Sequence, residues 1–596
     1  MTWISPFLVQ HGKFFIFLVF MMTSCQQVNA DKIGPKSGNP IANYEDTTHI
    51  KTEEIVPRKT DPGSLNLFGY YLRALYAEKN QDVVSAAEFY TESLAQDSAN
   101  EELLQASFSN LYASGQIIAS SKIAQQAEAL NLILMLGSEP ALAIASKEGD
   151  WRAVLALSDT AILEGGSQHI GYIFRAWAMY NLDQKSAAIS IFETLSELLE
   201  EQKIGDAKFV NLFIAQLFIL ENELSQASAY LSEIAINRET NPELTIAVAE
   251  AYALIGQTTL AKKISGFLSE NYNQEVMHRW IEERSNQQIS DRDKKYFLAQ
   301  SILQLNLFTL TDDTIQLLER RAQLAQFIAN SAEISLPAGY FTLFQLADDK
   351  NDFENSQRYF NFIKETDPRF QVALMLHLYQ LKENNKTLEA INKLSAYLSE
   401  NSNKPILEEL LADFYRMNNQ FFNAIKMYES ALSHKPNSGD VFRKLGVCYQ
   451  KTQQQEKAET AFAIALELNP NDSSALNYLG YWWADEGRNL DQAIELIVKA
   501  VELYPDNGYY ADSLGWVYYK IGEMERAVLW LEHAVRLTPD DAIIHEHLGD
   551  VYWIVGRPLE ARYKWQFALE MYSDAAPKKR VFQKIQSGVS HIVIQD

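Results

Sequence analysis

The stretch that decides the fold runs from Gly439 to Ser573, where one pattern returns four times: KLGVCY at 444–449, YLGYWW at 478–483, SLGWVY at 513–518 and HLGDVY at 547–552. The Leu-Gly pairs are separated by 34, 35 and 34 residues, and an aromatic residue follows three positions after each glycine. The repeated positions, including an alanine later in each copy, are Leu445, Gly446, Tyr449, Ala458, Leu479, Gly480, Trp483, Ala493, Leu514, Gly515, Tyr518, Ala527, Leu548, Gly549, Tyr552 and Ala561. A period of this length indicates one structural unit repeated four times.

Each copy predicts a pair of antiparallel helices. The leucine, the glycine and the aromatic residue lie on one side of the first helix, and the glycine lets the second helix approach closely. Pro470, Pro505 and Pro539 close the first three copies, where the chain must leave the helix, because proline has no amide hydrogen and disfavours helix before it. The extra residue of the second copy falls in 485–489, between the two predicted helices, where an insertion spares the packing.

This pattern resembles the tetratricopeptide repeat (TPR) family. The resemblance implies an all-α fold of the α-solenoid type, a right-handed superhelix of helix hairpins that binds other proteins. Weaker copies extend over most of the chain, and we expect roughly 13 to 15 helix pairs stacked without a break.

The strength of the repeat divides the sequence into segments. We expect degenerate repeats in 64–286, an irregular helical segment in 287–336, TPR-like repeats in 337–438, four clear units in 439–573, and a capping helix with a tail in 574–596. Because 287–336 lacks the small residues, it is the expected place for a change of superhelix shape or a subdomain boundary. The basic run Lys578–Lys584 is expected to be a solvated cap, with contact to the acidic body or a membrane as the alternative.

The first 24 residues are typical of an export signal. Lys13 precedes the apolar run Phe14–Met22, which is shorter than the roughly 20 residues that span a bilayer. Cys25 follows this run in a setting that resembles a bacterial lipobox, which implies lipidation of Cys25 and a lipid anchor to the membrane. Cleavage after Ala30, which would leave a soluble periplasmic or secreted product, is the alternative. Residues 25–63 are polar and predict a flexible tether.

Gln26 resembles the residue that follows the cysteine in lipoproteins sorted outward. The resemblance implies an outer membrane lipoprotein of the Gram-negative cell envelope that faces the periplasm, with a soluble periplasmic protein as the alternative.

Composition and motifs exclude several classes of function. The net charge of −25 repels nucleic acid, and no phosphate-binding glycine loop is present. His545 and His547 are two residues apart on a predicted helix and cannot share a metal ion. No carboxylate pair is distinguished as an acid and base, so we expect no enzyme activity, no cofactor and no metal. A homo-oligomer is possible but nothing in the sequence indicates one.

The first helices of the repeats supply a candidate peptide groove. In the TPR family these helices line the concave surface, and the matching positions here are Asn477, Tyr481, Asp485, Asp512, Trp516, Tyr519, Lys520, Glu546, Asp550 and Trp553. The resemblance implies an aromatic strip with acidic margins, suited to a segment that carries apolar and basic side chains. The alternative is that Trp516 and Trp553 only pack between neighbouring helices.

The expected function is therefore that of a protein-protein interaction scaffold or adaptor in the bacterial envelope. The resemblance to bacterial TPR lipoproteins implies a carboxy-terminal processing protease or cell-wall hydrolases as partners. The alternatives are a soluble periplasmic or secreted TPR protein, or an accessory factor of envelope glycan synthesis.

Overall fold

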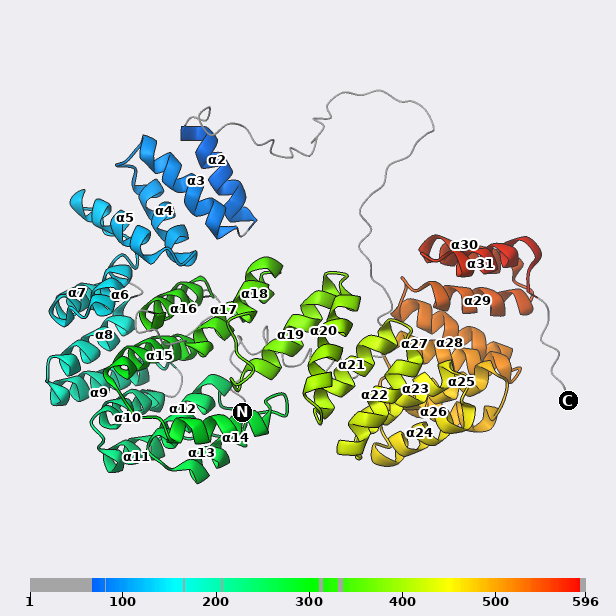
Figure 1. Ribbon diagram of the computed structural model, residues 1–596. Coiled ribbons are helices and arrows are strands. Elements are labelled where there is room, and N and C mark those ends of the chain that lie inside the picture. Colours follow the sequence, from blue (N-terminus) through cyan, green and yellow to red (C-terminus); the bar gives the residue numbers. More distant parts are fainter. Residues whose placement is uncertain are drawn as a thin grey trace, which may run out of the picture. The chain divides into compact units, whose positions relative to one another are not determined.

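The computed structural model describes residues 67–80, 82–164, 167–204, 207–309, 315–330 and 336–589. The predicted signal, Cys25 and the tether of 25–63 lie outside the described residues. Every regular element in the described ranges is a helix, from α2 to α31 with the short 3-10 helix η2 (Figure 1), which confirms the predicted all-α solenoid. The chain divides between Lys386 and Thr387 into two compact parts, called here the N-terminal unit and the C-terminal unit.

The N-terminal unit begins with consecutive helices that pack in antiparallel pairs. Its helices are α2 (Leu67–Lys79), α3 (Val83–Gln96), α4 (Glu101–Ala113), α5 (Ile117–Ala129), α6 (Ser138–Glu148), α7 (Trp151–Leu163), α8 (Gln168–Asn181), α9 (Lys185–Glu201), η2 (Ala207–Val210), α10 (Asn211–Leu220), α11 (Leu224–Ser232), α12 (Pro242–Leu254), α13 (Thr258–Ser265), α14 (Gln274–Ser285), α15 (Asp291–Thr309), α16 (Ile315–Asn330), α17 (Pro337–Asp349), α18 (Phe353–Phe360) and α19 (Phe370–Glu383).

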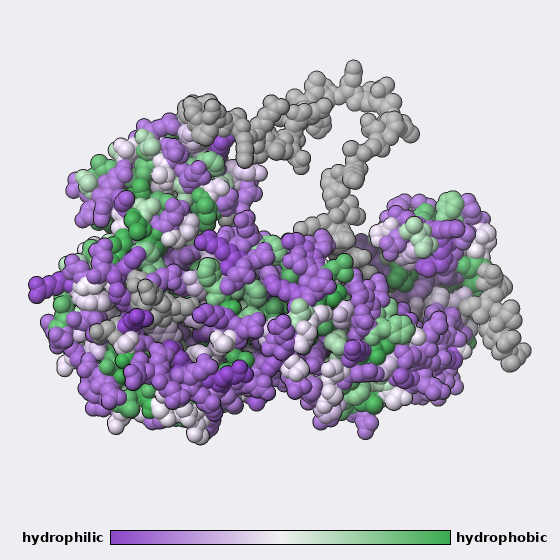
Figure 2. Space-filling view, viewed as in Figure 1, coloured by the Kyte–Doolittle hydropathy of each residue, from purple (hydrophilic) through white to green (hydrophobic). Residues whose placement is uncertain are grey.

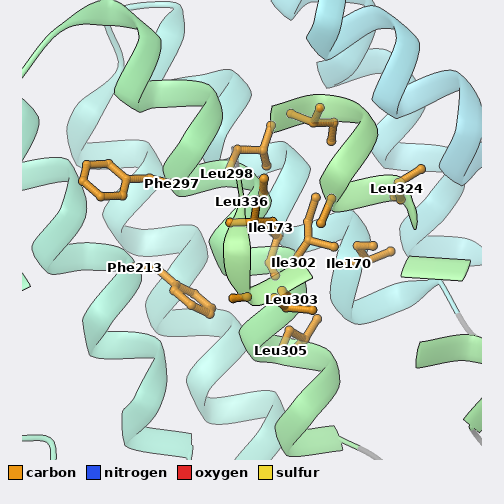
Figure 3. Packing of buried hydrophobic residues seen from close by; sticks show 14 of the residues in the cluster. Ile170, Ile173, Phe213, Phe297, Leu298, Ile302, Leu303, Leu305, Leu324 and Leu336 are labelled. Atoms are coloured by element: carbon orange, nitrogen blue, oxygen red, sulfur yellow. The ribbon is translucent and has the colours of Figure 1, made fainter. Parts of the chain in front are cut away.

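Helices α15 and α16 form a hairpin that does not continue the stack. α15 packs against α8 and α10, and α16 packs against α4 and α6, which are alternate helices of the preceding pairs (Figure 1). The hairpin therefore lies along one side of the stack, with buried apolar residues between them: Ile170, Ile173, Phe213, Phe297, Leu298, Ile302, Leu303, Leu305 and Leu324 (Figure 3).

This arrangement corrects the expectation for 287–336. In the described part of this segment, α15 and α16 are regular helices of the N-terminal unit, and the division between the units falls later, after Lys386. The spacing of the repeat is absent here, and the hairpin packs on several helices of the stack as well as on its own sequence neighbours.

The C-terminal unit continues as regular pairs. Its helices are α20 (Thr387–Glu400), α21 (Pro405–Met417), α22 (Phe421–His434), α23 (Gly439–Lys451), α24 (Gln455–Leu468), α25 (Ser473–Asp485), α26 (Leu490–Leu503), α27 (Gly508–Lys520), α28 (Met524–Leu537), α29 (Ala542–Ile554), α30 (Pro558–Met571) and α31 (Ala575–Ser587). The side chains of Asp472, Asn507 and Asp541 accept hydrogen bonds from first-turn amides and begin α25, α27 and α29.

The repeated glycines of the C-terminal unit stand where paired helices approach most closely. A Cβ atom at Gly515 would lie 2.6 Å from Cγ of Leu531 on α28, and one at Gly549 would lie 2.5 Å from the ring of Trp565 on α30. At Gly480 it would lie 2.9 Å from the backbone oxygen of Ala493. These distances are shorter than ordinary carbon contacts, so a side chain at these positions forces the pair apart.

Hydrophilic residues cover most of the face that Figure 2 shows, and hydrophobic residues gather there in separate patches. Among the described residues, no helix has both the length and the hydropathy needed to cross a bilayer.

Candidate functional site

The candidate site is the set of first-helix residues predicted above, called here the concave strip, from Asn477 on α25 to Trp553 on α29. The rings of Tyr481 on α25 and His547 on α29 have centroids 6.3 Å apart, although α27 comes between these helices in the chain. Side chains from alternate first helices therefore converge, as they do on the inner side of a curved stack.

The centre of the concave strip is closed by its own side chains. Trp516 on α27 is only 8% exposed and stacks on His547 of α29 with centroids 4.1 Å apart, and Tyr519 lies 5.0 Å from Trp516. This geometry agrees with the alternative interpretation, in which Trp516 packs between neighbouring helices. Trp553 is partly buried and lies 5.6 Å from Trp565.

A buried histidine and carboxylate join α27 to α29. Nδ1 of His547 lies 2.9 Å from the Asp512 carboxylate, and both residues are buried. Burial opposes a positive charge on His547, but the Asp512 carboxylate together with Asp550 and Glu546 outweighs burial and raises the pKa of the imidazole. His545 points elsewhere, because its Nε2 lies 2.8 Å from the Pro539 oxygen. Within the described ranges no group of side chains is arranged to hold a metal ion.

The acidic end of the concave strip is already paired with the last helix of the chain. Glu546 accepts hydrogen bonds from Nε of Arg580 at 2.8 Å and from Nζ of Lys584 at 2.6 Å. Lys584 also donates to Asp550 at 2.6 Å, and the Tyr572 hydroxyl donates to Glu546 at 2.7 Å. Glu546 and Asp550, which the sequence predicts to contact a basic partner, are therefore already paired with basic residues of the same chain.

This finding agrees with the alternative in which the basic run contacts the acidic body, and it corrects the expectation of a solvated cap. Lys578 and Lys579 are exposed, but Arg580 and Lys584 bind Glu546 on the body. The sequence held a signal that could have shown this: Arg580 follows Glu546 by 34 residues, as Lys584 follows Asp550. α31 therefore continues the register of the first helices.

The other end of the concave strip remains open. Asp485 is exposed, and Tyr481 and Lys520 are partly exposed, with Nζ of Lys520 donating to the Asp485 backbone oxygen at 2.9 Å. Asn477 is 7% exposed, and its Oδ1 accepts no hydrogen bond from the described part of the chain. A buried amide oxygen without a partner is costly, so Asn477 is suited to receive an N–H donor from a bound segment.

The pairing of Glu546 predicts a stability that depends on pH. Burial alone would raise the pKa of Glu546, but Arg580 and Lys584 outweigh it and lower the pKa to about 2. Because the folded pKa lies below the usual value, this stabilisation is fully present above about pH 4.5 and is lost as the pH falls toward 2. We expect Glu546→Gln to cost up to ~3 kcal/mol of unfolding free energy at pH 6, and the cost to shrink below pH 4.5.

Urea unfolding of both proteins between pH 2.5 and 6, followed by tryptophan fluorescence, measures this difference. Subtracting the two curves removes the titration of the other carboxylates. A difference that stays constant over this range would contradict the assigned pairing.

Two family models match the C-terminal unit. One described as "Tetratricopeptide repeat" matches residues 443–508, and one described as "TPR repeat" matches residues 515–556. Both matches fall within 439–573, where the sequence predicts four clear units.

Curated proteins with related sequences share parts of the chain. A TPR repeat-containing protein of Pseudomonas aeruginosa is 26% identical over 197 residues, which is 33% of this chain and 33% of that protein. BBSome complex member BBS4 of Bos taurus is 35% identical over 104 residues, 17% of this chain and 20% of that protein. The chain thus spans a third and a fifth of the lengths of these relatives.

Among solved structures, a tetratricopeptide repeat protein from Parabacteroides merdae is 16% identical, with a TM-score of 0.38. The match covers 42% of this chain and 99% of the other.

Proposed function

We propose that this tetratricopeptide repeat protein is a scaffold that holds a partner segment with apolar and basic side chains on the concave strip of its C-terminal unit. Tetratricopeptide repeats are modules of protein-protein interaction. The observation that carries the proposal is the buried Asn477 amide with its unpartnered Oδ1, on the same strip as exposed Asp485 and half-buried Tyr481.

The three residues offer complementary contacts to such a segment. Tyr481 supplies an aromatic surface for an apolar side chain, and Asp485 supplies a negative charge for a basic one. Asn477 can accept a hydrogen bond from a backbone amide or a cation. An acidic segment would place its charges against Asp485 and would be repelled.

Fluorescence anisotropy with two labelled helical peptides, one of leucine and lysine and one of leucine and glutamate, tests the proposal. We expect the wild-type chain to bind the basic peptide at least about tenfold more tightly than the acidic one, and Tyr481→Ala with Asp485→Lys to remove most of that preference. Circular dichroism serves as the folding control.

A matched variant separates site binding from attraction by net charge. Asp491 on α26 and Tyr563 on α30 are exposed on second helices, so Asp491→Lys with Tyr563→Ala changes the charge equally without touching the concave strip. If both variants weaken binding to the same extent, the net charge of −25 attracts the peptide and the proposed site is wrong.

We also propose that the scaffold acts at the Gram-negative outer membrane, facing the periplasm, with lipidated Cys25 as its anchor. The short apolar run Phe14–Met22, which ends shortly before this cysteine, supports the proposal. The partners proposed from the resemblance are a carboxy-terminal processing protease or cell-wall hydrolases.

Replacing Cys25 by alanine is expected to move the protein from the membrane fraction to the soluble fraction and to abolish labelling by radioactive palmitate. Cys448 is fully buried, so Cys448→Ala is the matched control and should stay in the membrane fraction with its label. A Cys25→Ala variant that stays in the membrane fraction would contradict the anchor, whereas an unlabelled wild type in the soluble fraction would favour the form produced by cleavage after Ala30.

A further inference from the structure

Helix α31 has the position of a first helix but little of its packing. Arg580 and Lys584 follow Glu546 and Asp550 by 34 residues, the spacing of the repeat. Yet Val581 is the one residue of α31 that is buried, whereas α29 buries nine. Phe582 corresponds to Leu548 and is 50% exposed, while Leu548 is 1% exposed. No second helix covers α31 within the described ranges.

Ionic contacts supplement the limited apolar packing of α31, in which Val581 is buried and Ile585 is partly buried. The side chain of Glu546 is 4% exposed and that of Asp550 is 9% exposed, and Arg580 and Lys584 pair with them at 2.6–2.8 Å. At the end of the helix, Gly588 lies directly against the Trp553 ring, because a Cβ atom there would fall 2.0 Å from Cζ2. The helix thus lies at the acidic end of the concave strip.

We propose that α31 is a releasable occupant of this end of the concave strip, and that a basic helix of a protein partner replaces it. The inference rests on the proposed function and names the partner's chemistry: two cations four residues apart on one helical face, with a small apolar side chain beside the first. This is the pattern of Arg580, Val581 and Lys584.

The partner helix must be basic because it takes the place of the basic helix α31. When α31 leaves, Glu546 and Asp550 lose their cations, and a neutral or acidic segment in its place would bury them unpaired. A helix with the same two cations restores both pairs. An element with one buried apolar side chain belongs to the part of a fold that opens most readily.

The test uses the full chain and a labelled peptide with the sequence of residues 574–589. The release variant is Arg580→Gln with Lys584→Gln, and the matched control is Lys578→Gln with Lys579→Gln, which changes the charge equally at exposed positions. We expect the release variant to bind the peptide at least tenfold more tightly than the wild type or the control. The same peptide carrying Arg580→Glu and Lys584→Glu should not bind.

Hydrogen exchange of α31, measured on the same proteins, shows whether the helix leaves the concave strip. Faster exchange at 575–587 in the release variant alone is expected. Unchanged exchange shows that the ion pairs do not hold the helix, and faster exchange without peptide binding shows that no basic helix replaces it. Either result overturns the inference.

Two further results separate this inference from the proposed function. A wild-type dimer with protected α31 helices would assign the replacing helix to a second copy and overturn the choice of a different partner. If wild-type binding at Tyr481 and Asp485 persists while the release variant gains nothing, only this inference fails. If the leucine and lysine peptide binds neither protein, the proposed function fails as well.

Discussion

Replacing Arg321 by alanine is expected to lower the unfolding free energy of the N-terminal unit by about 3–5 kcal/mol. Arg321 on α16 donates from Nη2 to Glu139 on α6 at 2.7 Å, and the two side chains are 3% and 0% exposed. The same carboxylate accepts from the Tyr112 hydroxyl at 2.6 Å and from Ser167 at 3.0 Å. Without the guanidinium, a buried carboxylate loses its only positive partner among these contacts.

Urea unfolding, combined with hydrogen exchange of α4, α6, α15 and α16, measures the effect. The control is Lys262→Ala, which removes an ion pair to Glu282 in the same unit whose side chains are 33% and 61% exposed. Such a surface pair contributes about 0–1 kcal/mol. A loss for Arg321→Ala no larger than that of the control would show that the hairpin does not depend on this pair.

The fold of this hairpin could be predicted only in part from the sequence. The sequence predicts an irregular helical segment in 287–336, whereas the structure has the two helices α15 and α16 there, and their partners lie far away in the chain. Arg321 is 182 residues from Glu139, and Trp177 donates to Ser301 across 124 residues at 3.3 Å. No local pattern indicates such contacts, so the sequence predicts only an irregular segment there.

The C-terminal unit was more predictable because its contacts repeat at a fixed spacing. The Leu-Gly pairs and the alanines indicate which faces of each helix pair meet, and the helices begin and end in register with them. The exposure of the concave strip was harder to predict, since it depends on how tightly the stack curves. That curvature brings His547 onto Trp516 and buries both.

The two units differ in which of their first helices are contacted by another helix of the same chain. In the N-terminal unit the hairpin α15–α16 packs along α4, α6, α8 and α10, so those helices have a partner within the chain. In the C-terminal unit α31 pairs with the acidic end, and within the described residues no hydrogen bond or ion pair is seen between α31 and Asn477, Tyr481 or Asp485. The proposed partner segment is therefore expected at the end of the concave strip that α31 does not pair with.

The other large expected effect is on the helix pairs of the C-terminal unit. We expect Gly515→Leu to lower the unfolding free energy of this unit by about 1–3 kcal/mol or more, because the new side chain overlaps Leu531 on α28. The backbone nitrogen of Leu531 would lie 3.1 Å from the new Cβ, so the neighbouring side chain cannot relieve the overlap by rotation alone.

Gly515→Ala tests the close approach through the direction in which the unfolding midpoint changes. At an open helical position, alanine stabilises by about 0.5–1 kcal/mol relative to glycine. A lowered unfolding midpoint for the alanine variant therefore requires a clash larger than that gain. Tryptophan fluorescence reports on this unit because it holds Trp482, Trp483, Trp516, Trp530, Trp553 and Trp565, six of the ten tryptophans. Gln492→Leu, which adds a leucine at an exposed position of α26, controls for the added apolar surface. If Gly515→Ala raises the midpoint, the two helices do not meet at Gly515 as closely as the structure shows.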